Sequence, residues 1–128
     1  MLFKKKLLPT VIFSGITAEV IKDWSNYYWK FTYKNVDFYT EDRVFEIPTT
    51  ETLDKYLSWI ENNKEQINAS ISDAMKHWEV SVETAKNGGI TIQSPSKISV
   101  LFIGDDWGDM GGDFVFENGV ITEEGWGD

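Results

Sequence analysis

The sequence predicts an α+β fold, an antiparallel sheet with a pair of helices inserted in the middle of the chain and packed on one face. Three observations predict it: strand-like segments fill the first third, helical periodicity fills the middle, and strand-like segments return in the last third. The length of 128 residues, with 41% hydrophobic and 15% aromatic residues, fits a single domain over 1–128 with one core.

The first third alternates aromatic with polar residues over Trp29–Tyr33, which is the period-two pattern of a half-buried strand. Lys34-Asn35 can turn the chain, so this strand should pair with the next one in a hairpin. We expect strands at 11–13, 29–33, 36–39 and 44–47, and a loop or a short helical turn at 17–25.

The middle of the chain carries two apolar stripes at helical spacing, and Thr49 or Thr50 can cap the first helix. The stripes are in phase, but one helix over 50–86 would be about 55 Å long. A globule of this size has a radius of gyration of only ~14 Å. We therefore expect a break near Asn62-Asn63 and a second helix that ends at the glycines of 87–89.

The last third contains the strongest local signal. Asn118-Gly119 lies between two apolar runs, 114–117 and 120–122, which predicts a hairpin with a type I′ turn. Ile98–Ile103 is apolar on both faces and fits a central strand, and 90–93 fits a short one.

The charge is −9 and unevenly spread, because residues 104–128 hold eight acids and no base. Such a field repels nucleic acid and anionic lipid and attracts a basic protein. No apolar run approaches the ~18 residues of a membrane span, and Pro9 interrupts the short apolar run that could belong to a signal peptide. We expect no nucleic-acid or membrane partner and, since cysteine is absent, a cytoplasmic location.

The stretch "GDDWGDMGGD", residues 104–113, could hold calcium. With Asp106 as the first ligand of an EF-hand loop, Gly111 and Glu117 fall at the sixth and twelfth positions, as required. The third and fifth positions are Gly108 and Met110, which lack a side-chain oxygen. We therefore expect no cofactor and a glycine-permitted loop between two strands, with calcium as the alternative. The alternative ligands are Asp106, Asp109 and Asp113.

The four aspartates of the stretch, Asp105, Asp106, Asp109 and Asp113, could supply a pair of carboxylates to a hydrolase, which is a second alternative. His77 is the only histidine, and no G-x-S-x-G nucleophile motif is present. A phosphate loop is not expected, because no lysine is present in the stretch and a strand follows it. We therefore favour a protein that is not an enzyme.

Trp107 and Trp126 lie in Gly/Asp-rich surroundings next to predicted strand ends. Exposed there, they could anchor a protein partner or stack on a sugar, which adds carbohydrate to the alternative ligands. Folded back, they would cover the end of the sheet. The sequence leaves both readings open.

The C-terminal third resembles a group of short bacterial domains of unknown function, similar to immunity proteins and other accessory proteins of toxin loci. The resemblance covers about 30 residues, and the Glu-His pair that such relatives often carry is replaced by Asp109-Met110. It implies a binding role and carries over no catalytic residue. The residues that match are 98–103, Trp107, Asp109, Gly111, 114–116, Asn118-Gly119, 120–122, Gly125 and Asp128.

The function predicted from these observations is a small acidic binding protein, immunity-like, that recognises a basic partner such as a toxin domain. Carboxylates of the C-terminal region would steer and pair with its cations, and the two tryptophans would be the buried anchors of the complex. The predicted partner-binding residues are Asp105, Asp106, Trp107, Asp109, Asp113, Glu123, Glu124 and Trp126.

Overall fold

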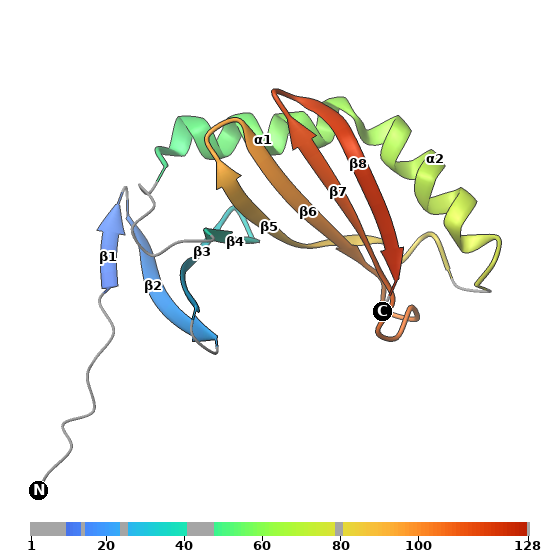
Figure 1. Cartoon of the computed structure of the whole chain (residues 1–128), viewed down its shortest axis with the longest axis horizontal. Coiled ribbons are helices and arrows are strands. Elements are labelled where there is room, and N and C mark those ends of the chain that lie inside the picture. Colours follow the sequence, from blue (N-terminus) through green and yellow to red (C-terminus); the bar gives the residue numbers. More distant parts are fainter. Residues whose placement is uncertain (1–9, 14, 24–25, 41–47, 79–80, 128) are drawn as a thin grey trace, which may run out of the picture.

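The computed structural model describes residues 10–13, 15–23, 26–40, 48–78 and 81–127. Within them, strands β1 to β8 form one sheet, in which the strands are arranged in sequence order (Figure 1). Helices α1 and α2 follow β4 in the chain and precede β5. The predicted α+β class with a mid-chain helix pair is confirmed. The strands are β1 Thr10–Phe13, β2 Ile16–Asp23, β3 Asn26–Tyr33, β4 Val36–Thr40, β5 Lys86–Ser94, β6 Lys97–Ile103, β7 Gly111–Glu117 and β8 Val120–Gly127, and the helices are α1 Thr50–Asn62 and α2 Lys64–Met75.

The sheet is antiparallel between successive strands except where β4 runs parallel to β5. A fully antiparallel sheet was expected, so this pair is a correction. The reason is the helix pair, which carries the chain back before β5 begins, and parallel strands need a crossover connection of this kind. Phe38 of β4 is the register partner of Ile90 of β5, and both side chains are buried.

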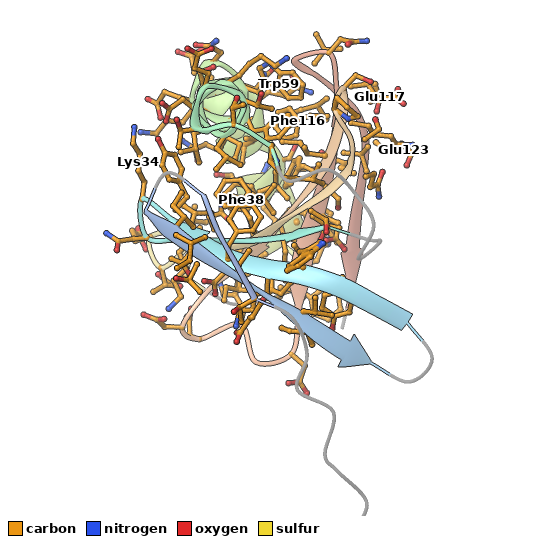
Figure 2. The ribbon with its side chains drawn as sticks, turned by 90° about the vertical axis from the view of Figure 1, so that its left-hand side faces the viewer. Lys34, Phe38, Trp59, Phe116, Glu117 and Glu123 are labelled. Carbon is orange, nitrogen blue, oxygen red and sulfur yellow. The ribbon has the colours of Figure 1, made fainter. Side chains whose placement is uncertain are left out.

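The core lies between the sheet and the helices. Buried and partly exposed residues alternate along β6, where Ile98, Val100 and Phe102 face inward. Figure 2 shows Phe38 and Phe116 pointing to the interior beside α1, while Glu123 points away from the helices. We call the side of the sheet that faces away from α1 and α2 the outer face.

Helix α1 is fixed to the turns of the sheet. The hydroxyl of Thr49 caps its first turn by accepting from the backbone N–H of Thr52 at 3.3 Å. Tyr56 is fully buried and donates its hydroxyl to the carbonyl of Pro95 at 2.9 Å, in the β5–β6 turn. Asn63, where the predicted break between the helices is confirmed, donates to the carbonyl of Gly119 at 3.0 Å, in the β7–β8 turn.

Both predicted two-residue hairpin turns are present. Lys34 and Asn35 have φ of 50° and 63°, and Asn118 and Gly119 have φ of 50° and 87°. Positive φ at both central positions is the requirement of a type I′ turn, which matches the twist of the strands that it joins. The tight β7–β8 connection determines which residues of the acidic C-terminal region lie opposite one another.

Two further predictions are wrong, and one lies outside the described residues. The segment 17–25, expected as a loop or helical turn, contains most of β2, in which Ala18 and Val20 are buried. The second helix ends at Met75 instead of at the glycines of 87–89, which lie inside β5. The strand expected at 44–47 falls on residues that the structure does not describe.

Candidate functional site

The stretch 104–113 forms the connection between β6 and β7 and the first residues of β7. Two successive turns build it, since the backbone N–H of Trp107 donates to Gly104 and that of Met110 donates to Trp107, both at 3.2 Å. Gly108 has a φ of +61°, a conformation that side chains other than glycine rarely adopt. The predicted loop between two strands is therefore confirmed.

Trp107 is a core residue, with only 4% of its surface exposed. Its indole N–H donates to the carbonyl of Ser81 at 2.8 Å, and its ring centre lies 6.0 Å from that of Trp126. A Cβ on Gly104 would overlap the indole ring, so the glycine makes room for it. The prediction that Trp107 is an exposed partner anchor is wrong, because the side chain folds back and covers the end of the sheet.

Asp105 and Asp106 connect the loop to the segment between α2 and β5. The carboxylate of Asp106 accepts from the backbone N–H of Ser81 at 2.8 Å and from the hydroxyl of Thr84 at 2.9 Å. These two donors favour the charged form and hold the pKa of Asp106 below its ordinary value of 3.8. Asp105 forms a 2.7 Å ion pair with Lys86. Contacts within the chain thus engage both predicted partner-binding carboxylates.

Four other predicted partner-binding carboxylates lack the contacts that Asp105 and Asp106 make. Asp109, Asp113, Glu123 and Glu124 are exposed, and within the described part of the chain none of them forms an ion pair or a side-chain hydrogen bond. Glu117, by comparison, lies 3.7 Å from Lys97. The loop and the last strand therefore present several negative charges that no cation of the described residues compensates.

The sheet register places these carboxylates on different sides. Asp113 is opposite Gly125, and Glu123 is opposite Val115, so both side chains belong to the outer face (Figure 2 labels Glu123). Glu124 is the register partner of the buried Phe114 and belongs to the other side of β8. Asp113 and Glu123 thus share one surface with Glu117, and Asp109 lies in the loop that borders it.

Trp126 is half-buried near the C-terminal end of β8. Phe114 meets its ring edge-to-face with centres 6.0 Å apart, and a Cβ on Gly112 would lie 2.6 Å from its Cη2. The side chain is therefore held in place by Gly112, Phe114 and Trp107 and keeps only part of its surface for a partner.

The alternative metal ligands do not form a cluster. Among the described residues, no group of three or more His, Asp or Glu side chains is placed to hold a metal ion. One reason is geometric, because Asp106 turns toward Ser81 and Thr84 whereas Asp113 lies on the outer face.

Among the described residues, every carboxylate with a shifted pKa has its pKa lowered. The pKa of Asp54 is lowered by Lys34 and Tyr33, that of Glu83 by the Ser81 hydroxyl, and that of Asp106 by its two donors. A general acid of a hydrolase needs the opposite shift. His77 is exposed just beyond the end of α2.

Sequence reasoning missed a hollow of about 420 Å³ on the outer face, beside the loop. Leu101 and Ile103 of β6 line it, together with Asp109, Asp113 and Gly125. The available signal was the two-sided apolar pattern of β6. A strand of that kind is usually covered on both faces, yet the outward Leu101 and Ile103 remain only partly buried. We call this feature the outer-face hollow.

Neither of the helices formed by the described residues is long and apolar enough to cross a bilayer. The comparisons with known proteins give no matching family model, no matching curated protein and no matching solved structure.

Proposed function

We propose that this protein is a non-enzymatic binding protein that recognises a basic protein through the acidic surface around β7 and β8, in the manner of an immunity protein that neutralises a toxin domain. The observation that carries the proposal is the group of exposed carboxylates Asp109, Asp113 and Glu123, which lie on or beside the outer face and pair with no cation among the described residues. Within the part of the chain that the structure describes, lysines pair with the neighbouring Asp105 and Glu117 but not with these three.

The mechanism is electrostatic steering followed by docking. Charges on a surface raise the rate at which an oppositely charged protein arrives, and they select the orientation in which it docks. The turns of the sheet are tied to α1 through Asn63 and Tyr56, so the strands present the carboxylates on a preformed surface. A preformed surface loses less conformational entropy on binding.

The test is affinity capture from a lysate of the source cell, at low and high salt, followed by measurement of the association rate with each purified basic protein that is captured. The acidic variant is Asp109→Asn/Asp113→Asn/Glu123→Gln. The matched control, Glu61→Gln/Glu65→Gln/Asp73→Asn, removes three exposed helix charges and gives the same net charge.

The proposal predicts that high salt and the acidic variant each lower the association rate by roughly tenfold or more, while the control changes it little. Equal losses of association rate in the two variants would show that the partner responds only to the net charge of the protein. A partner whose rate depends on neither salt nor the acidic variant would contradict the proposal.

Calcium binding by the loop, and the cytoplasmic location, remain predictions. A rise in melting temperature with millimolar calcium that a chelator reverses would support the metal. Asp106→Asn serves as the variant in that experiment, because Asp106 is the first residue of the alternative ligand set.

A further inference from the structure

Missing side chains keep the outer-face hollow open. A Cβ on Gly125 or on Gly127 would meet no atom within 4 Å, so each of these glycines borders open space. A Cβ on Gly111 would lie 2.9 Å from Cδ1 of Leu101, which shows that the opposite wall is close-packed. The hollow is thus a surface recess with one open side along β8.

The lining combines an apolar part with a charged part. Leu101 and Ile103 supply branched aliphatic side chains, and Asp109 and Asp113 supply the carboxylates. The nearest lysines in the strand register are engaged elsewhere, since Lys97 lies 3.7 Å from Glu117 and Lys86 lies 2.7 Å from Asp105. An aliphatic surface beside uncompensated carboxylates is the complement of a long side chain with a cationic end.

Arginine fits this lining better than lysine. Its guanidinium group is planar and carries five N–H donors, so one group can serve two carboxylates, whereas the lysine ammonium is a compact point charge. The methylene stem of arginine would cover Leu101 and Ile103. The volume of about 420 Å³ lies within the range of about 300–1,000 Å³ that is usual for ligand sites.

We propose that the outer-face hollow is the receptor for one arginine side chain of the basic partner, with its stem on Leu101 and Ile103 and its guanidinium group between Asp109 and Asp113. This inference rests on the function proposed above and specifies which chemical group of the partner is recognised. The acidic surface then supplies steering, and the hollow supplies the fixed point of the complex.

The direct test uses three peptides of the form acetyl-Gly-Gly-X-Gly-Gly-amide, where X is arginine, citrulline or lysine. Citrulline keeps the shape of arginine and removes its charge. Binding is followed by the NMR shifts of the backbone N–H groups of Gly108 and Gly111, which line the hollow. We expect the arginine peptide to bind roughly tenfold more tightly than the citrulline peptide, and more tightly than the lysine peptide. Equal binding of arginine and citrulline, tighter binding of lysine, or no arginine binding would overturn the proposal.

Gly125→Leu separates this inference from the proposed function, because it fills the hollow and leaves every charge in place. Its control is Ser72→Leu, an equal addition of apolar surface at an exposed position of α2. We expect Gly125→Leu to lose the arginine-peptide shift and the control to keep it. Gly127→Leu is a second variant with the same expected result, since its added Cβ also meets no atom within 4 Å.

The outcomes distinguish the two proposals. Full-strength arginine binding in folded Gly125→Leu and Gly127→Leu would overturn the arginine receptor. If in addition the Asp109→Asn/Asp113→Asn/Glu123→Gln variant still lost its partner, the proposed function would stand without the hollow. If that variant kept its partner at the unchanged rate, the proposed function itself would fail.

Discussion

The two halves of the stretch 104–113 each contain two aspartates and two glycines, but their surroundings differ. In the first half, Asp106 and Trp107 bind Ser81, a residue from the segment between the helices and the sheet. In the second half, Asp109 and Asp113 contact no cation within the described part of the chain and border a hollow. A surplus of acid in one short segment can therefore serve both folding and recognition, and only tertiary contacts separate the two roles.

The largest effect should come from Trp107→Ala, which removes a buried indole and its hydrogen bond to Ser81. We expect the free energy of unfolding to fall by about 3–5 kcal/mol, as for other large aromatic residues truncated in a core. Urea denaturation followed by circular dichroism measures it. A loss below about 1 kcal/mol would mean that the first half of the stretch does not hold the fold together.

A smaller effect is expected for Gly112→Ala, because its Cβ would lie 2.6 Å from Cη2 of Trp126 and would displace the ring. Overpacking of this kind costs about 1–3 kcal/mol. Gly125→Ala is the matched control, since its Cβ would meet no atom within 4 Å. Thermal melts of both variants check the difference, and equal stability of the two would contradict the placement of Trp126.

Asp106 should make stability depend on pH in the acid range. Its pKa in the folded protein lies below the ordinary value of 3.8, so its contribution is present above that value and is lost as the pH falls through the lower, folded-state pKa. Asp106→Asn should therefore be less stable than the native chain near neutral pH, and the gap should close in acid. Melting temperatures between about pH 6 and about pH 2.5 measure the gap; a gap that is constant over this range would contradict the assignment.

The smallest effect on stability is expected for Asp109→Asn/Asp113→Asn, which should change the free energy of unfolding by no more than about 0.5 kcal/mol. The effect should appear instead in binding, with the affinity for an arginine-containing partner falling by roughly three- to tenfold. Isothermal titration and a denaturation curve on the same sample give both numbers. A clear loss of stability without a change in affinity would reverse the roles assigned to the two halves.

The fold was predictable where local chemistry decides it. The Asn118-Gly119 turn is set by a few adjacent residues, and it is confirmed. The helix break near Asn62-Asn63 was predicted from the length of the apolar stripes relative to the size of the domain, and it is confirmed as well. The segment 17–25 was not predictable in this way. β2 is a strand because β1 and β3 pair with it on either side. Such pairing depends on segments outside 17–25, so the residues of this segment alone do not predict it.

The predicted end of the second helix failed for a tertiary reason. The apolar stripe continues in helical phase through Val82, but Ser81 is held by Trp107 and Asp106, which lie more than 20 residues further along the chain. The glycines of 87–89 enter β5, where the register shifts between Asn87 and Gly89 and the φ of Gly89 is 147°. Contacts between distant segments thus end the helix although the local apolar pattern would allow it to continue.

The candidate site was predictable as a region, and its internal division was not. Composition identified the acidic stretch and named the residues now found at its surface, Asp109 and Asp113. It could not show that Trp107 turns inward, because a tryptophan beside glycines is compatible with either orientation. Nor could it show the outer-face hollow, which exists because Gly125 and Gly127 of β8 come to lie beside β7 and its neighbour β6.

The most direct measurement compares two variants that each remove two negative charges, Asp105→Asn/Asp106→Asn and Asp109→Asn/Asp113→Asn, for melting temperature and for affinity toward the arginine peptide. The predicted result is a crossover: the first pair lowers the melting temperature and keeps the affinity, and the second keeps the melting temperature and lowers the affinity. Equal changes in both variants would contradict the account, because the two halves of the stretch would then act only through their total charge.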